Sequence, residues 1–324
     1  MNLDNSDRPA LVGAELLDAI EAFIGRFVVL PSEHYLVATT LWAAHCHALD
    51  CFESTPRLSA LSPEWGSGKT RLLEILELLV PRPVCTINAS SAALFRKVSD
   101  PEGAPTLLID EADTIFGPRA SKDHEDLRGF VNAGHRRGAT SLRCVVRGKA
   151  VEVEEFPAYA AVALAGLDDL PDTIMSRSVV NRMRRRAPGE KIEPFRHRLH
   201  ASEGHALRDQ LALWMDSTRE VLVESWPDMP DEIQDRPADV WEPLLAIADA
   251  AGGSWPGRVR VAAVADVTDS RRARDQSLGV RLLADLRAVF VASGCGTSAT
   301  SATPADWLST VSYTHLTLPT TPYV

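Results

Sequence analysis

The first part of the chain has apolar residues at the spacing of an amphipathic helix. Leu16, Leu17, Ile20, Phe23, Ile24 and Phe27 recur with a helical period, which puts them on one face. Ser32 is a candidate N-cap for a second helix that continues to about Leu49. We therefore expect an N-terminal helical segment over residues 1–56.

Between residues 57 and 187, short apolar runs alternate with helical patterns. This alternation is typical of a mostly parallel sheet with helices on both faces. The expected strands are residues 57–61, 84–87, 106–110, 159–165 and 179–183, and the expected helices are residues 70–79, 91–98, 125–135 and 172–176. The pattern predicts an α/β fold with a three-layer core.

A different pattern interrupts this core after Gly138. Residues 141–146 and 151–155 flank the tripeptide Arg147-Gly148-Lys149, which predicts a β-hairpin with a basic tip. From Ala187 onward the apolar positions return to a helical period. We expect residues 188–292 to form a helical lid that follows the core.

The C-terminal residues are set apart by their sequence. Residues 311–320 (VSYTHLTLPT) can be back-translated into a DNA string that resembles the end of a transposon-derived sequencing adapter. We interpret residues 311–324 as translated adapter and exclude them from fold reasoning. The alternative is a disordered polar tail. Residues 293–310 are then the start of a truncated C-terminal segment.

A glycine-rich segment, SPEWGSGKT over residues 62–70, lies between the first core strand and the next helix. Its glycines stand where a phosphate loop turns backbone N–H groups toward an anion. The Lys69 side chain would reach the β- and γ-phosphates of ATP, and Thr70 would bind magnesium. The first glycine of the motif is replaced by proline, so the entry of the loop departs from the motif while the cradle is retained. The predicted ATP-binding residues are Pro63, Glu64, Trp65, Gly66, Ser67, Gly68, Lys69, Thr70 and Arg71.

Two carboxylates end the third core strand. Asp110 would join Thr70 around Mg²⁺, and Glu111 would polarise the attacking water. The letters DEAD at residues 110–113 invite a DEAD-box helicase interpretation, but the chain after them is too short for a second motor domain. The loop and the carboxylates together predict an ATP hydrolase that uses ATP and Mg²⁺, with Lys69 and Glu111 as catalytic residues.

Arg177 follows the short helix at residues 172–176, a position that resembles that of the arginine finger in AAA+ proteins. A finger stabilises charge on the phosphoryl group of a neighbouring subunit, so a catalytic role for Arg177 implies a homo-oligomer. The alternative is a local pair with Asp172. Arg136 and Arg137 are the other candidates for the finger.

Longer stretches resemble a single family. They are SPEWGSGKTRLLE, LLIDEAD, LRGFVNAGHRRGAT, AGLDDLPDTIMSRS and DRPADVWEPLLAIADAAGGSWP. Over about residues 36–292 the chain is similar to the family catalogued as domain of unknown function 3631. This resemblance implies an AAA+-like P-loop NTPase associated with phages and mobile elements. One departure is that the fourth strand ends at Ala165-Gly166-Leu167, without the Asn or Thr that usually orients the attacking water in AAA+ proteins.

Two functions fit this pattern. The first is a helicase-like DNA motor or remodeller in mobile-element replication, whose hairpin residues Arg147 and Lys149 contact single-stranded or duplex DNA. The second is an ATP-gated switch or protein remodeller that does not bind DNA and acts through the lid.

Charge and hydropathy bear on DNA binding and on localisation. The net charge of −10 over 324 residues argues against a surface that binds nucleic acid throughout. Residues 119–149 nevertheless carry eight basic and three acidic side chains, and residues 177–198 carry eight and two. No run approaches the roughly eighteen apolar residues of a membrane span, and no secretory leader is evident. We expect a cytoplasmic protein that does not bind membranes.

Overall fold

The computed structural model describes residues 13–86, 91–117, 125–147, 150–167, 169–275 and 282. Contacts divide the chain into two units, Met1–Asp266 and Val267–Val324. The first unit holds the sheet, the hairpin and the helices up to the first part of α10 (Trp255–Asp275). The segments predicted at residues 293–310 and 311–324 lie outside the described residues.

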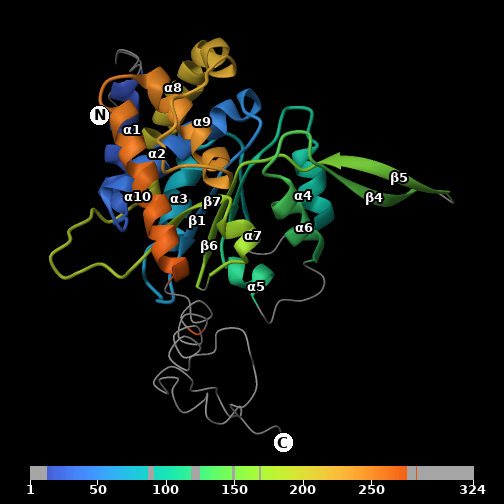
Figure 1. Ribbon diagram of the computed structural model, residues 1–324. Coiled ribbons are helices and arrows are strands. Elements are labelled where there is room, and N and C mark those ends of the chain that lie inside the picture. Colours follow the sequence, from blue (N-terminus) through green and yellow to red (C-terminus); the bar gives the residue numbers. More distant parts are fainter. Residues whose placement is uncertain are drawn as a thin grey trace, which may run out of the picture. The chain divides into compact units, whose positions relative to one another are not determined.

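A five-stranded sheet in the order β2-β3-β6-β1-β7 forms the centre of the first unit (Figure 1). Every pair of neighbouring strands is parallel. The central strands are buried throughout, as expected for a parallel sheet covered on both faces. The predicted α/β core is thus confirmed, with strand bounds that differ by up to three residues. The strands are β1 (Arg57–Leu61), β2 (Pro83–Thr86), β3 (Thr106–Ile109), β6 (Val162–Gly166) and β7 (Ser178–Arg182).

Helices cover both faces of this sheet. One face packs against α4 (Ser91–Val98), α5 (Ala112–Phe116), α6 (Glu125–Ala133) and α7 (Asp172–Met175). There the rings of Phe95 and Phe130 meet edge to face. On the other side, α3 (Lys69–Leu79) contacts β1, β2 and β6. The sequence pattern did not predict α5, a short helix directly after the strand that carries the carboxylates.

The remaining helices pack on one another beside α3. They are α1 (Ala14–Phe27), α2 (Glu33–His45), the 3₁₀ segment η2 (Cys46–Cys51), α8 (His197–Val223) and α9 (Arg236–Ala251). Helix α8 contacts α1, α3, η2 and α9, and α2 packs against α9. None of the described helices is both long and apolar enough to cross a membrane.

These helices confirm part of the pattern and correct part of it. The two predicted N-terminal helices are present, although the second ends as an α-helix at His45. The helical period expected from Ala187 is wrong for its first ten residues, since α8 begins only at His197. Pro188 and Pro194 account for the difference, because proline cannot continue a helix. The domain boundaries after residues 56, 187 and 292 stay predictions.

The predicted hairpin is confirmed as β4 (Thr140–Arg147) and β5 (Ala150–Pro157), two antiparallel strands that project away from the core (Figure 1). At its base, the Phe156 ring lies 6.0 Å from that of Phe95, between centroids. Further out, the side chains of Leu142 and Val153 are 68% and 69% exposed. The hairpin therefore presents apolar as well as charged residues to solvent.

Candidate phosphate-binding site

The loop between β1 and α3 has a shape that its glycines permit. The N–H of Ser62 donates to the Gly166 carbonyl (3.1 Å), which fixes the start of the loop at the carboxyl edge of the sheet. Gly66 and Gly68 have φ values of 74° and 90°, which residues with a Cβ rarely adopt. The Gly68 carbonyl accepts the N–H of Leu72 (2.9 Å) in the first turn of α3. The unpaired N–H groups that begin this helix therefore lie where β1 ends, a favourable place for an anion.

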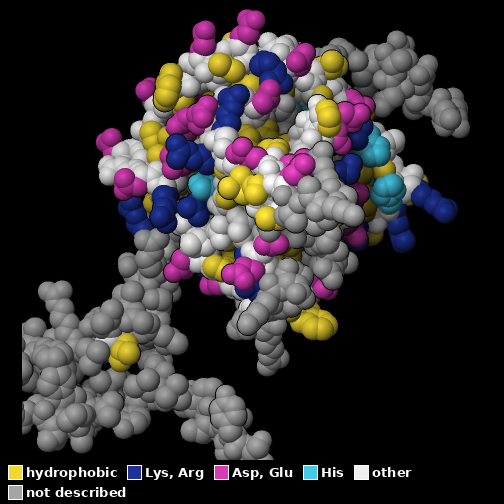
Figure 2. All heavy atoms as spheres, turned by 90° about the vertical axis from the view of Figure 1, so that its right-hand side faces the viewer, with side chains coloured by type: hydrophobic (Ala, Val, Ile, Leu, Met, Phe, Trp, Pro, Cys, Tyr) yellow, Lys and Arg dark blue, Asp and Glu magenta, His cyan; other side chains and the backbone are white. Residues whose placement is uncertain are grey.

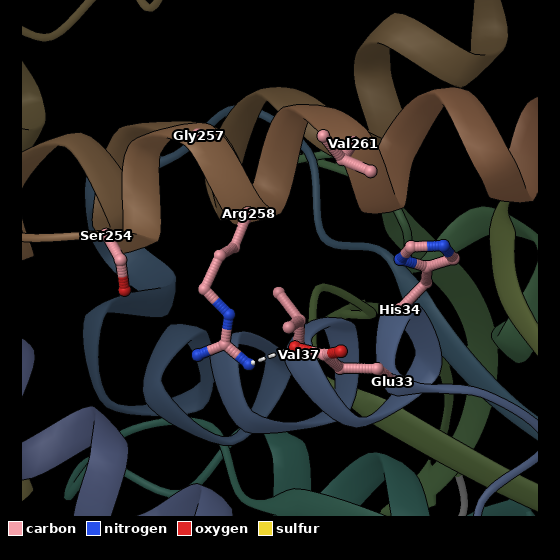
Figure 3. Close-up of a pocket in the computed structure, with 7 residues that line it drawn as sticks. All are labelled: Glu33, His34, Val37, Ser254, Gly257, Arg258 and Val261. Carbon is pink, nitrogen blue, oxygen red and sulfur yellow. Dashed lines mark hydrogen bonds and ion pairs between the residues drawn. The ribbon is translucent and has the colours of Figure 1, made fainter.

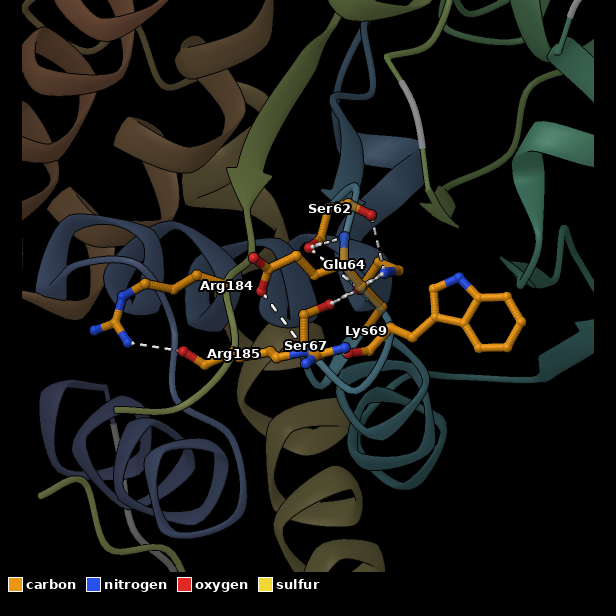
Figure 4. Close-up of polar contacts among 7 residues, drawn as sticks. Ser62, Glu64, Ser67, Lys69, Arg184 and Arg185 are labelled. Carbon is orange, nitrogen blue, oxygen red and sulfur yellow. Dashed lines mark hydrogen bonds and ion pairs between the residues drawn. The ribbon is translucent and has the colours of Figure 1, made fainter. Parts of the chain in front are cut away.

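Lys69, the first residue of α3, folds its side chain back into the loop (Figure 4). Its Nζ donates to the carbonyls of Ser62 (3.2 Å) and Glu64 (3.1 Å) and to Ser67 Oγ (3.0 Å). Partial burial lowers the pKa of the Lys69 ammonium, although nearby Asp110 acts in the opposite direction. Three neutral acceptors hold this cation, and a phosphate oxygen would be a stronger partner because it is charged.

Thr70 and Asp110 come from different elements and meet at the same edge. Thr70 Oγ1 donates to Asp110 Oδ2 at 2.8 Å, and Asp110 Oδ1 accepts the N–H of Glu111 at 2.9 Å. Glu111 is exposed and has a left-handed backbone with φ of 55°. This conformation is uncommon outside glycine and occurs preferentially at functional sites. The structure thus brings together the two predicted magnesium ligands and places Glu111 beside them.

Asp113 is a site residue that the sequence interpretation missed. Its Oδ1 accepts the N–H of Leu167 (3.0 Å), so it caps the end of β6 next to the phosphate loop. Its charge also acts on the Lys69 ammonium. The signal was present in the DEAD letters, which were considered only as a helicase motif. Asp113, from α5, thus contacts the strand end at which the sequence lacks the Asn or Thr that is usual in AAA+ proteins.

The other predicted loop residues lie at the surface. Pro63, Glu64 and Trp65 are exposed, and the Trp65 side chain is 75% exposed. Arg71 points along α3, where it forms an ion pair with Glu74 and stacks over a phenylalanine ring from another segment. Arg71 is therefore engaged within the protein, whereas the loop apex is open.

Arg177 lies at the opposite edge of the sheet. It directly precedes β7, where Ser178 pairs with Arg57 at the amino end of β1. Its Nη1 donates to the Thr173 carbonyl (2.7 Å) rather than to Asp172. Burial lowers the pKa of Arg177, and the neighbouring Arg236 lowers it further. The length of β1, about 3.3 Å per residue over five residues, separates Arg177 from the phosphate loop of its own chain.

The two alternative fingers lie near the same edge. Arg137 forms an ion pair with Glu53 (3.4 Å), and the backbone of Arg136 bridges to Ser54. Both side chains are exposed. The structure therefore places all three candidate arginines away from Lys69.

The predicted DNA contacts are only partly within the described residues. The backbone of Arg147 ends β4 opposite Ala150, whereas Lys149 and the side chain of Arg147 lie outside the described part of the chain.

A second missed residue, Arg185, touches the loop from the segment that follows β7. Its Nε donates to the Trp65 carbonyl at 2.7 Å and lies 3.7 Å from a carboxylate oxygen of Glu64. The signal was the cluster of arginines at positions 182, 184, 185 and 186, which was considered only as a candidate DNA surface.

A pocket of about 450 Å³ lies elsewhere, between α2 and α10 (Figure 3). Arg258 crosses it and forms ion pairs with Glu21 and with Glu33. It shares no lining residue with the phosphate loop. In the described part of the chain, no group of three or more His, Cys, Asp or Glu side chains could hold a metal ion.

A family model and a curated relative each match part of the chain. Residues 182–303 match the model of a family described as "Protein of unknown function (DUF3631)". A curated relative from Saccharopolyspora erythraea, "Uncharacterized 28.9 kDa protein in xis 5'region", is 46% identical over 108 residues. That alignment covers 33% of this chain and 40% of the relative, so the chain spans about two fifths of the relative's length. The resemblance to this family is therefore confirmed for residues 182–303, which begin at the end of β7 and include Arg185 but not the phosphate loop.

Proposed function

We propose that this chain is an AAA+-like P-loop NTPase that binds and hydrolyses ATP. The observation that carries the proposal is the hydrogen bond between Thr70 Oγ1 and Asp110 Oδ2, with Lys69 at the adjoining loop. A hydroxyl from the start of a helix and a carboxylate from a neighbouring strand are the two groups that hold Mg²⁺ in this class of site. The glycine loop and the N-terminus of α3 would receive the phosphates.

The residues fit Mg²⁺ because this ion needs few protein ligands. In ATPase sites it is bound through one or two protein groups, substrate phosphates and water. Thr70 and Asp110 supply such a pair, already 2.8 Å apart. When bound, the ion would neutralise charge on the phosphates.

Three side chains of the protein have separate roles in this proposal. Lys69 would exchange its three loop acceptors for phosphate oxygens. Glu111, exposed beside Asp110, would accept a hydrogen bond from the attacking water and orient it. Asp113 keeps the end of β6 in place and so fixes one wall of the site.

Arg177 would serve the site of a neighbouring subunit. It lies at the amino edge, so it cannot contribute to the phosphate loop of its own chain. With Arg236 nearby, it forms a positively charged position that an anion from another copy would stabilise. We therefore propose a homo-oligomer as the active form.

Surface charge alone does not decide whether the macromolecular partner is DNA or a protein. Basic and acidic side chains are mixed over the face shown in Figure 2. On the hairpin, exposed Leu142 and Val153 favour a protein partner, whereas Arg147 and Lys149 in its sequence favour DNA. The Saccharopolyspora erythraea relative is named for its position in the 5′ region of xis, which agrees with the mobile-element association implied by the resemblance. We keep the DNA motor as the first proposal and the protein remodeller as the second.

ATP binding and phosphate release test the proposal directly. Lys69→Ala should abolish binding, and Glu111→Gln should bind ATP and lose hydrolysis. Lys97→Ala and Glu102→Gln are matched controls, because both side chains are exposed and distant from the loop in sequence. If the wild-type protein neither binds nor hydrolyses ATP, the proposed function is wrong.

Variants of the β4–β5 hairpin distinguish a DNA motor from a protein remodeller. A DNA motor predicts that single-stranded DNA stimulates hydrolysis and that Arg147→Ala/Lys149→Ala removes this stimulation. A protein remodeller predicts an ATPase that is indifferent to DNA. Leu142→Ser/Val153→Ser changes the apolar positions without altering charge and is the matched control for the first measurement.

A further inference from the structure

The segment that follows β7 runs beside the phosphate loop. The N–H of Met183 donates to the carbonyl of Leu61, the last residue of β1, at 2.7 Å. A Cβ placed on Gly68 would lie 3.7 Å from Met183 Cε. Residues 183–185 therefore lie against both ends of the loop, although they are more than 110 positions away in sequence.

Within this segment, one arginine is held by the loop itself. Arg182 pairs with Asp169 and Arg184 pairs with Glu190, both through two hydrogen bonds. Arg185 instead donates its Nε to the Trp65 carbonyl at 2.7 Å (Figure 4). Its other contact is the Glu64 carboxylate, 3.7 Å away. The Arg185 guanidinium is therefore fixed on the loop backbone at its apex.

This contact orients a peptide group that would otherwise be free to turn. The peptide between Trp65 and Gly66 is trans, so its C=O and N–H point in opposite directions. While Arg185 holds the carbonyl, the Gly66 N–H is directed away from Arg185. Gly66 makes a reversal of this peptide inexpensive, because glycine tolerates both signs of φ and a Cβ there would meet nothing within 4 Å.

We propose that Arg185 is a positioning residue of the phosphate site, which holds the Trp65 carbonyl so that the Gly66 N–H is available to a phosphate oxygen. This inference rests on the proposed function of the loop as an ATP site. Preorganised N–H donors favour an anion because no reorientation is needed when it binds. A hydrogen bond to a charged acceptor is among the stronger ones in proteins.

The test compares Arg185→Gln with Arg186→Gln. Both remove one positive charge from the same exposed segment, and no hydrogen bond or ion pair of Arg186 occurs among the described residues. We expect Arg185→Gln to weaken binding of ATP and of inorganic triphosphate roughly 10- to 100-fold. Arg186→Gln should stay within about twofold of wild type. The nucleotide-free melting temperature should be unchanged in both, since the contact is at the surface.

A spectroscopic readout separates positioning from direct contact. In ¹⁵N-glycine-labelled full-length protein, the Gly66 amide resonance should shift on addition of ATP in wild type and in Arg186→Gln. In Arg185→Gln at saturating ATP this shift should be reduced, because the glutamine amide is too short to reach the Trp65 carbonyl. Arg185→Lys should restore part of the shift, because its longer side chain carries an ammonium that can donate to this carbonyl.

Three results would overturn the inference. One is wild-type affinity in Arg185→Gln; another is an equal loss in Arg186→Gln, which would mean a general charge effect. The third is weakened binding with an intact Gly66 shift, which would mean that Arg185 contacts the phosphate itself. If the wild-type protein binds no ATP, the proposed function itself is wrong, and the role of Arg185 falls with it. If Arg185→Gln does not fold, the test uses Arg185→Lys, in which the Gly66 amide resonance reports the orientation of the same peptide group.

Discussion

The two edges of the parallel sheet hold positive charge in different ways. At the carboxyl edge, Lys69 is partly exposed and donates to acceptors of its own loop. At the amino edge, Arg57 is 1% exposed and donates to the carbonyls of Ala160 (2.6 Å) and Val131 (2.9 Å). Burial lowers the pKa of both cations. The acceptors of Lys69 lie within seven positions of it in the sequence, whereas those of Arg57 are 103 and 74 positions away.

This difference distinguishes the proposed binding site around Lys69 from the structural role of Arg57. The acceptors of Lys69 are local, so a ligand can replace them without disturbing the packing of other elements. The acceptors of Arg57 belong to α6 and to the segment just before β6, so they cannot be exchanged without loosening the packing of these elements on β1. The N–H of Arg57 also donates to the Arg177 carbonyl (2.9 Å). The backbone of Arg57, rather than its charge, therefore fixes the position of the proposed trans-acting arginine just before β7.

The largest expected effect is on Arg177. If it acts on a neighbouring subunit, Arg177→Ala should bind ATP normally and lose roughly 10³- to 10⁵-fold in turnover. Mixing Arg177→Ala with Lys69→Ala should restore part of the activity, because some mixed sites then contain both wild-type residues. Turnover is measured by phosphate release at saturating ATP, with subunit exchange followed by native mass measurement.

Arg136→Ala is the comparison variant, since Arg136 is exposed near the same edge. A large loss of turnover in Arg136→Ala, with normal turnover in Arg177→Ala, would transfer the proposed role to Arg136. Subunit exchange without any recovery of activity would mean that Arg177 does not act across an interface.

The next largest effect is on stability, and it is tested by replacing either Arg57 or Lys69 with methionine. Arg57→Met should lower the free energy of unfolding by about 3 kcal/mol, because two buried carbonyls lose charged donors. Lys69→Met should change it by less than about 1 kcal/mol and should instead remove ATP binding. Urea unfolding and calorimetric ATP titration measure the two quantities. Equal destabilisation by both variants would contradict the proposed distinction between the edges.

Local patterns predicted much of the fold and the local part of the site. The period of apolar residues gave α1, α3 and the core strands, because these elements alternate or repeat within one segment. The spacing of glycines with Lys69 and Thr70 predicted a phosphate loop, and Asp110 was predicted to join Thr70 around Mg²⁺. The two side chains are hydrogen-bonded at 2.8 Å, while their role as magnesium ligands stays a prediction.

The parts that were missed depend on contacts between distant segments. Arg185 reaches the loop only because β7 pairs with β1 in a register that places Arg182 opposite Leu61. Nothing near Arg57 in the sequence indicates burial, since its acceptors are 74 and 103 positions away. Helix α5 has only five residues, too few for a periodic signal.

The smallest effect concerns pH and again distinguishes the amino edge. His45 lies close to Arg57 and is fully buried, with its Nε2 at 3.0 Å from Thr55 Oγ1. Burial, assisted by the charge of Arg57, lowers the pKa of His45 from 6.5 to about 3. The unfolded chain therefore takes up a proton below about pH 6.5 that the folded chain does not, so stability is complete above that pH and declines as the pH falls toward 3.

His45→Gln tests this contribution, because an amide can occupy the position of Nε2 without titrating. Between pH 7 and 5.5 the wild-type protein should lose about 1 kcal/mol more stability than His45→Gln, measured by urea unfolding at each pH. Burial also lowers the pKa of His47, to about 4, so His45→Gln should retain part of the acid sensitivity. Lys69→Met should show the full wild-type decline, because none of the contacts of Lys69 among the described residues involves a histidine. An identical decline in wild type and His45→Gln would mean that His45 is protonated in the folded protein, and its burial next to Arg57 would then need another explanation.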